Sequence, residues 1–214
     1  MQTNEAQKDY STAEEIANSV THGLGTLLSI AGLVYLILLA VERGDVWHIV
    51  SFSIFGATLI LLYLASTLYH SFQKESLKRL FKKLDHSGIF LLIAGTYTPF
   101  MLVSLRGPWG WSLFGVIWGL AIAGIILKFF FIGRFKKISL AIYIFMGWLC
   151  VIAGNEFLNN VSAGSLMLLL FGGLSYTAGT IFYVWKKLPY NHAIWHLFVL
   201  GGSIFHFFAV ASLL

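Results

Sequence analysis

Seven apolar runs, each close to the length needed to cross a lipid bilayer, constrain the fold of this chain more than any other feature. A membrane-spanning helix requires about 20 consecutive apolar residues. The runs are Thr21–Val41, Val46–His70, Asp85–Leu105, Trp109–Phe131, Ile138–Gly154, Ala163–Trp185 and His192–Leu214, and the fifth is the shortest. Only 11% of the 214 residues are charged, whereas a soluble domain carries about 25%. The sequence therefore predicts an all-α integral membrane protein whose residues 21–214 form a seven-helix transmembrane bundle.

The basic residues are distributed unevenly between the two ends of the predicted bundle. Twelve of the 14 Lys and Arg residues fall at the end that holds the N-terminus: Lys8, Lys74, Lys78, Arg79, Lys82, Lys83, Lys128, Arg134, Lys136, Lys137, Lys186 and Lys187. Only Arg43 and Arg106 fall at the other end. The positive-inside rule then predicts a cytoplasmic N-terminus and an outside C-terminus. This pattern explains the net charge of +5 without nucleic acid, for which the chain carries no motif. We expect a multi-pass protein of the bacterial plasma membrane.

The polar residues 1–20 form a segment that we assign to the cytoplasmic side. Glu14, Asn18 and His22 follow one another at intervals of four, which places them on one face of a helix. The pattern predicts a short amphipathic helix on the membrane surface, with these side chains in solvent. His22 lies at the membrane level of His192, however, so it is also a candidate neighbour of a functional site.

Two patterns within the runs predict local packing. Pro99 lies inside the third run, where it should kink the helix and release backbone groups that need local partners. Gly115, Gly119 and Ala123 recur at intervals of four in the fourth run, a spacing that permits close approach of another helix. The single cysteine, Cys150, lies in the middle of the fifth run and is interpreted as a packing residue.

The last run begins with two histidines, His192 and His196, that share one helix face. Neutral imidazole is the commonest protein ligand for metals, and two at this spacing can reach one ion. Polar side chains are costly in lipid, so the pair should face the interior of the bundle. Polar residues on other helices should then lie opposite this pair in the interior of the bundle.

Three further polar residues fall at the same membrane level. The second run ends with Ser66 and His70, again four residues apart, and the third begins with Asp85. Taken alone, His70 could snorkel to water and Asp85 could cap its helix and favour the positive end of the helix dipole. Their common level with the two histidines instead favours a shared site.

Three histidines with one open position form the ligand set of a catalytic zinc, which retains a water molecule of lowered pKa. We therefore predict zinc ligands at His70, His192 and His196. Asp85 would act as the general base or hydrogen-bond partner of that water, and Ser66 would orient groups nearby. Imidazole also suits iron and copper, but the lack of Cys and Met nearby favours zinc. The alternatives are a structural metal, or polar residues that join helices without any metal.

These residues carry a resemblance to a known family. The matching motifs are Ser66-x-x-x-His70, Leu84–Ile89 (LDHSGI), Ala94–Pro99 (AGTYTP) and His192-Ala193-Ile194-Trp195-His196. In this order they are specific, and they resemble the bacterial hemolysin III family within the progestin and adiponectin receptor (PAQR) superfamily. The resemblance covers nearly the whole chain. It implies a seven-helix bundle with its N-terminus inside, in agreement with the independent distribution of charge.

The resemblance also implies a site and an activity. It implies zinc bound by His70, His192 and His196, with Asp85 in contact with the zinc-bound water. Similarity to ceramide-cleaving receptors of the superfamily implies hydrolysis of an amide or ester bond of a membrane lipid near the cytoplasmic leaflet. The family name implies cytolytic, pore-forming activity as an alternative. A non-enzymatic membrane sensor or receptor with a structural zinc is a third. The roles of Glu14, Asn18, His22 and His86 stay open, as do the substrate and the oligomeric state.

Overall fold

The computed structural model describes residues 10–131 and 135–214. Lys8 and Arg134, two of the basic residues counted above, lie outside this part, as do residues 1–9 of the predicted N-terminal segment. The described residues contain seven helical spans long and apolar enough to cross a membrane, which confirms the predicted fold class. Their elements are α1 (Thr12–Arg43), α2 (Val46–Ser71), α3 (Glu75–Pro99), η1 (Phe100–Ser104), α4 (Pro108–Phe131), α5 (Lys136–Gly147), η2 (Leu149–Ala153), α6 (Gly154–Asn160), α7 (Ala163–Val184) and α8 (Asn191–Ala211).

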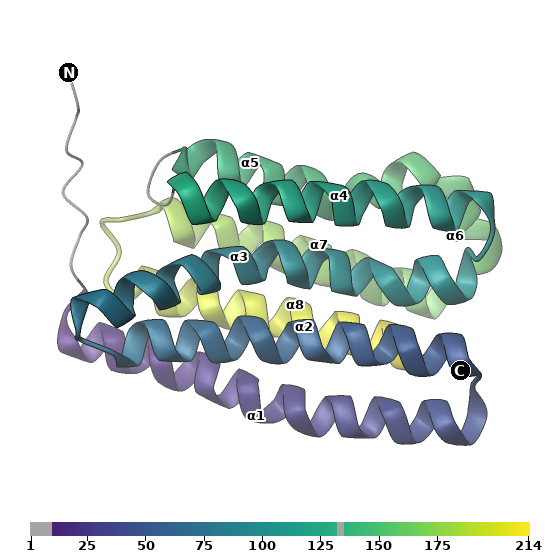
Figure 1. Cartoon of the computed structure of the whole chain (residues 1–214), viewed down its shortest axis with the longest axis horizontal. Coiled ribbons are helices and arrows are strands. Elements are labelled where there is room, and N and C mark those ends of the chain that lie inside the picture. Colours follow the sequence, from purple (N-terminus) through teal and green to yellow (C-terminus); the bar gives the residue numbers. More distant parts are fainter. Residues whose placement is uncertain (1–9, 132–134) are drawn as a thin grey trace.

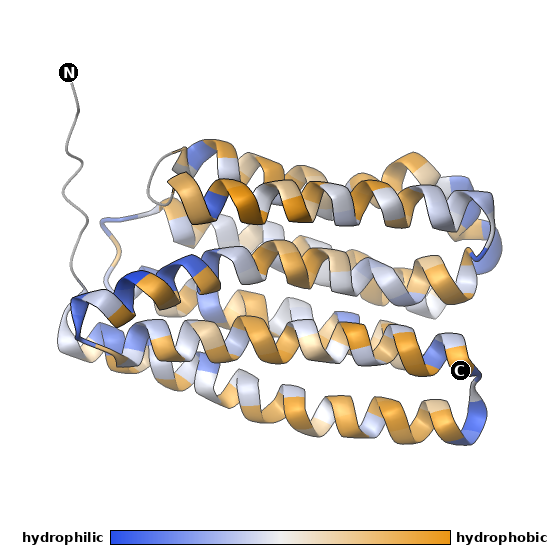
Figure 2. Ribbon diagram, viewed as in Figure 1, coloured by the Kyte–Doolittle hydropathy of each residue, from blue (hydrophilic) through white to orange (hydrophobic). Residues whose placement is uncertain are grey.

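The helices lie side by side along the long axis of the molecule (Figure 1). Helices α1 to α4 pack in sequence order, α7 packs against α8, and α8 also packs against α1. The start of α1 lies at the same end of the bundle as the C-terminal ends of α2, α4 and α7 (Figure 1). We call this end the basic end, because the chain connections there carry most of the Lys and Arg residues. Hydrophilic residues are dense at the start of α3 in this end, whereas hydrophobic residues dominate the middle of the helices (Figure 2).

Helix α1 runs from Thr12 to Arg43 without a break, so the polar segment and the first apolar run form one helix. Ser11 caps it, because its side chain accepts the Glu14 backbone N–H. The expectation of a solvated polar face is wrong: Glu14, Asn18 and His22 are only 8%, 0% and 1% exposed. This face packs onto the ends of α2 and α8. Helical periodicity located the face correctly but gave no information on what covers it.

The third span changes its geometry at the predicted proline. The α-helix ends at Pro99 and continues as the π-helical segment η1, in which the Leu105 N–H bonds the Phe100 carbonyl at 2.8 Å. Thr98, just before the proline, accepts a hydrogen bond from the Trp118 indole of α4 at 3.1 Å. The wider helical turn accommodates the proline, which lacks an N–H, without ending the span.

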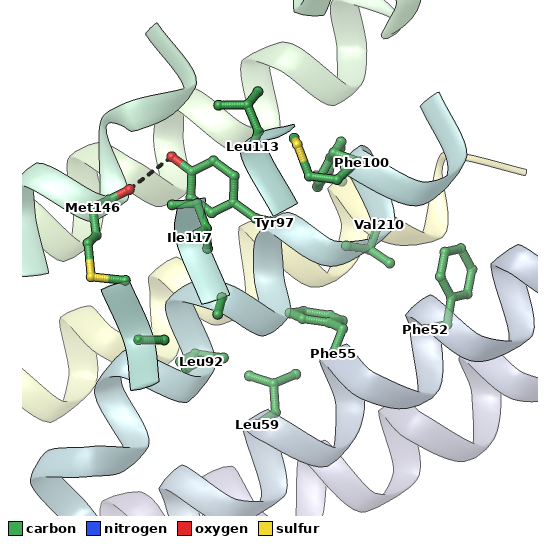
Figure 3. Packing of buried hydrophobic residues seen from close by; sticks show 14 of the residues in the cluster. Phe52, Phe55, Leu59, Leu92, Tyr97, Phe100, Leu113, Ile117, Met146 and Val210 are labelled. Carbon is green, nitrogen blue, oxygen red and sulfur yellow. Dashed lines mark hydrogen bonds between the residues drawn. The ribbon is translucent and has the colours of Figure 1, made fainter. Parts of the chain in front are cut away.

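The fifth span extends beyond the predicted Ile138–Gly154 and is interrupted. Its helical residues run from Lys137 to Asn160, through α5, the 3₁₀ segment η2 and α6. The apolar run ended at Gly154 because polar residues follow, yet the helix continues through them. At the interruption, the Tyr97 hydroxyl bonds the Met146 carbonyl at 3.0 Å (Figure 3). It also contacts the Gly147 carbonyl at 3.0 Å and accepts the Cys150 N–H at 2.9 Å.

The glycine spacing of α4 does not mark a packed face, whereas two glycines of α7 do lie in close packing. A Cβ at Gly115 or Gly119 would meet nothing within 4 Å, so the close approach predicted for α4 is absent between the described helices of this chain. In contrast, Cβ atoms at Gly172 and Gly179 would collide with His206 and Phe198, which marks the close packing of α7 on α8. Spacing alone did not distinguish a packed glycine face from an exposed one.

The hydrophobic core fills the centre of the bundle. Phe52, Phe55 and Leu59 of α2 meet Phe100 and Ile117 there, and these side chains are between 0% and 4% exposed (Figure 3). Many apolar side chains elsewhere point outward, as expected for a protein whose exterior contacts lipid. His70, near the end of α2, and His192, near the start of α8, lie outside this core, at the basic end.

Candidate metal centre

His70, His192 and His196 come together at the basic end of the bundle. Each offers a ligand atom, and these atoms all lie within 4.8 Å of one another. The three side chains are buried, with exposed fractions of 1%, 7% and 0%. The rings of the i and i+4 pair, His192 and His196, have centroids 4.5 Å apart. We call these residues the histidine triad. The structure thus groups the three histidines that the sequence selected.

The local sequence explains why these side chains converge. His70 is next to the last residue of α2, and His192 is in the first turn of α8. Helix α8 begins after Tyr190, whose left-handed backbone (φ 54°) turns the chain into the helix. Asn191 fixes this start by donating its side-chain amide to the Phe182 carbonyl of α7 at 3.0 Å.

The hydrogen bonds of the triad leave specific nitrogens without a partner. Nδ1 of His70 lies 2.5 Å from a Glu15 carboxylate oxygen, and Nδ1 of His196 lies 3.2 Å from the Asn18 carbonyl. Within the described residues, Nε2 of His70, Nε2 of His196 and both nitrogens of His192 have no hydrogen-bond partner. Buried unpaired nitrogens are costly. Three imidazoles in this arrangement fit a transition-metal ion, which would satisfy them.

Asp85 and Ser66 lie in the same buried region. Asp85, near the middle of α3, is 5% exposed and is close enough to His70 and His22 to interact with them electrostatically. One of its oxygens lies 3.3 Å from Nδ1 of His86, so the two neighbours contact each other although they point in different directions on the helix. The Ser66 hydroxyl, one turn before His70, is fully buried and has no hydrogen-bond partner among the described residues.

The first turns of α1 supply contacts that the sequence analysis missed. Glu15, rather than Glu14, bonds His70, and its other oxygen pairs with Lys78 of α3. His22 stacks on His196 with ring centroids 3.4 Å apart. Glu15, Asn18 and His22 also share a helix face, at spacings of three and four, so the signal was present in a second register. The sequence pattern does not say whether the face with Glu14 or the face with Glu15 meets the triad. The start of α1 at Thr12 decides this.

Tyr10, just before α1, covers the triad from the N-terminal side. Its ring centroid lies 5.2 Å from that of His192 and 6.1 Å from that of His70. Burial, together with the nearby Tyr183 and the Glu15 and Glu14 carboxylates, raises the pKa of the Tyr10 phenol above its ordinary value. Tyr10 therefore stays neutral and acts as an apolar cover with a polar tip.

The remaining histidines lie apart from this site. At the opposite end, Asp45 caps α2 and His48 completes the capping box, and the hydrogen bonds from His48 lower the pKa of the exposed Asp45 carboxyl. His206 lies ten residues beyond His196 on α8, about 15 Å along the helix, and bonds the Leu169 carbonyl at 3.2 Å. These contacts indicate that His48 serves the start of α2 and that His206 serves the packing of α8 on α7.

An apolar cavity begins beside the triad. Its volume is about 140 Å³, and its wall includes His22, Tyr97, Tyr143, Trp148, Trp195 and His206. Since His22 stacks on His196 and His206 lies further along α8, the cavity reaches from the metal-site level toward the middle of the bundle. Its lining is suited to an apolar ligand.

Comparison with known proteins gives the family. The family model described as "Haemolysin-III related" matches residues 10–207, which include the whole site. The chain belongs to the haemolysin-III family. It is 54% identical over 197 residues to "Hemolysin-3" of Bacillus cereus, covering 92% of this chain and 90% of the relative. It is 51% identical over 201 residues to the "Hemolysin-3 homolog" of Bacillus subtilis (strain 168), covering 94% of each.

Animal proteins extend the relationship of this haemolysin-III chain. The human "Monocyte to macrophage differentiation factor" is 30% identical over 203 residues, with coverage of 92% of this chain and 83% of the relative. This match supports the wider PAQR superfamily expected from the motifs. Together with the seven apolar spans, the family establishes a multi-pass protein of the cell membrane.

Proposed function

We propose that this haemolysin-III protein is a membrane-embedded zinc hydrolase that cleaves an amide or ester bond of a lipid near the cytoplasmic leaflet. One observation carries the proposal. Three buried histidines with unpaired nitrogens lie near a buried carboxylate, beside an apolar cavity. Structural polar clusters tend to satisfy their own hydrogen bonds, whereas this one leaves its nitrogens available.

The residues assigned to the ion are His70, His192 and His196. Neutral imidazoles without a nearby thiolate favour zinc among the transition metals. When bound, zinc polarises a carbonyl group and lowers the pKa of water to about 7. The triad supplies three ligands, which leaves one position of a tetrahedral site for chemistry.

The chain's own groups would handle protons and orientation. The Asp85 carboxylate is the general base that accepts a proton, and one of its oxygens lies 3.3 Å from Nδ1 of His86. The unpaired Ser66 hydroxyl can donate to a substrate oxygen or to Asp85. The Glu15 and Asn18 oxygens accept from the Nδ1 atoms of His70 and His196, which leaves both Nε2 lone pairs free for binding.

A membrane lipid suits the surroundings of this site. The cavity beside His22 is lined mainly by apolar side chains and can accept an alkyl chain, while the triad lies at the basic end, where polar lipid groups reside. With the N-terminus in the cytoplasm, as the basic residues predict, the scissile bond would lie in the cytoplasmic leaflet.

Metal content tests the proposal first. The purified wild-type protein should hold about one zinc per chain, and the double variant His192→Ala, His196→Ala should hold none. His48→Ala is the matched control, since it removes a histidine at the opposite end and should retain zinc. Zinc-loaded wild type is then supplied with lipid amides and esters, with the double variant as the blank. Absence of metal in wild type purified without chelators would refute the hydrolase.

The name of the bacterial relatives provides a second candidate, because "Hemolysin-3" denotes lysis. Under that proposal, the purified protein should release dye from liposomes even when the triad is removed. Release that depends on the triad would instead connect lysis to hydrolysed lipid. A sensor with structural zinc predicts a third result: chelation lowers the melting temperature while no lipid is cleaved.

A further inference from the structure

The start of α1 contacts every member of the histidine triad although it contributes none of the three ligands. The Glu15 carboxylate accepts from Nδ1 of His70, and the Asn18 carbonyl lies 3.2 Å from Nδ1 of His196. Tyr10 packs on the ring of His192. These contacts all come from residues 10–18, so one short stretch sets the surroundings of ligands from two other helices.

Glu15 is the charged residue among the three that contact the triad, and both of its oxygens are used. Oε2 lies 2.5 Å from Nδ1 of His70, and Oε1 lies 2.5 Å from Nζ of Lys78. The Glu15 side chain is 9% exposed, and a carboxylate so well covered requires partners of this kind. A carboxylate only accepts hydrogen bonds, so the proton of a neutral His70 must be on Nδ1. Its Nε2 then carries the lone pair that a metal needs.

We propose that Glu15 is a positioning residue of the metal centre. It fixes the tautomer and orientation of His70, and Lys78 holds the carboxylate in place from α3. The inference rests on the metal site proposed above and adds a role for a side chain outside the ligand set. A carboxylate that accepts from the distal nitrogen of a metal-bound histidine also strengthens that ligand, and losing such a partner typically weakens metal binding 10–100-fold.

A purely structural role is the competing explanation. Glu15 joins α1 to α2 and α3 through its two partners, so its loss could simply loosen the helices. Loosening would lower the melting temperature of the metal-free protein. It would leave the electronic spectrum of the bound ion unchanged, because the ligand set would be the same.

Cobalt(II) titration in detergent separates the two explanations, because its visible absorption reports ligand geometry as well as affinity. We compare wild type with Glu15→Gln and Glu15→Leu. Glutamine keeps an acceptor oxygen but loses the charge, and leucine loses both. Affinity should fall in that order, by about 10–100-fold for leucine, and the absorption bands should shift.

Glu14→Gln is the matched control for this titration. Glu14 is the adjacent carboxylate, and it accepts from the backbone N–H groups of Ser11 and Tyr190. Its substitution should leave cobalt affinity and spectrum unchanged. Glu15→Gln, which preserves size, keeps the test decisive if Glu15→Leu does not fold.

The outcomes are distinct. Wild-type affinity and spectrum in both folded Glu15 variants would overturn the positioning role while leaving the metal site intact. Equal losses in the Glu14 and Glu15 variants would also overturn it, in favour of general loosening. No cobalt or zinc binding by wild type would instead refute the proposed metal centre itself.

Discussion

At the scale of single residues, the proposed site combines groups assigned to bind an ion with a group assigned to accept a proton. The triad nitrogens are arranged to hold an ion, but none of them is assigned to accept a proton from water. Asp85 is the carboxylate available for that purpose, since Glu15 is engaged by His70 and Lys78. Asp85 is buried near His70, and one of its oxygens lies 3.3 Å from His86, so the proposed proton transfer is assigned to its other oxygen.

Asp85→Asn should separate metal binding from proton transfer. Asparagine has nearly the same shape but cannot accept the proton, so turnover of the lipid substrate should fall by about 10²–10⁴-fold while zinc stays bound. Turnover and zinc content are measured on the same preparation. Glu156→Gln, a half-buried carboxylate at the opposite end, should retain both. Full turnover by Asp85→Asn would remove Asp85 from the mechanism.

The sequence predicted which three histidines come together but not the residues that contact them, for a physical reason. His70, His192 and His196 were found because polar groups at one membrane level must face inward and have few partners there. Glu15 was missed because Glu14 and Glu15 fit the same periodic pattern almost equally well. In the structure, α1 begins after Ser11 and packs beside α2 and α3, so that Glu15 reaches His70 and Lys78. The sequence pattern contains neither the helix start nor these neighbours.

At the scale of helices, the departures from regular geometry are supported by side chains of neighbouring helices. The fifth span breaks at Gly147, where backbone groups lose their helical partners within the membrane. The Tyr97 hydroxyl of α3 replaces those partners, with contacts to two carbonyls and one N–H. This break also contributes Gly147 and Trp148 to the wall of the cavity.

Tyr97→Phe should therefore destabilise the protein. It removes only the hydroxyl and leaves buried backbone groups unsatisfied, which costs about 1–3 kcal/mol. Thermal unfolding in detergent, followed by circular dichroism, measures the change. Tyr35→Phe removes the same atom from a ring that is 53% exposed on α1, and its melting temperature should match wild type. Equal melting temperatures for Tyr97→Phe and wild type would show that water or lipid satisfies the break.

Helix number was predictable, whereas helix ends and contacts were not. Hydropathy gave seven spans because the bilayer fixes the length of an apolar run. It ended the fifth span too early, since a helix can continue to Asn160 through polar residues near the interface. The four-residue glycine spacing on α4 met no neighbour, because the same pattern fits any helix face whether or not another helix covers it.

At the scale of the whole molecule, the uneven charge assigns a direction to the bundle. The links at the α2, α4 and α7 ends lie together with the start of α1, and ten of the 12 basic residues that the structure describes fall in or beside those links. Basic links are retained in the cytoplasm. The histidine triad lies at the same end, so orientation also decides which leaflet would supply the proposed lipid substrate.

Cysteine labelling of intact cells tests this orientation, and the chain makes the design simple because Cys150 is its one native cysteine. In a Cys150→Ser background, Arg106→Cys and Lys187→Cys each replace one exposed basic residue, at opposite ends of the bundle. A membrane-impermeant maleimide should label the Arg106→Cys protein in intact cells and the Lys187→Cys protein only after lysis. The bias of twelve basic residues over two is too large for either single substitution to invert the protein. The reverse pattern would place the triad at the outer leaflet, and the proposed substrate would then have to be a lipid of that leaflet.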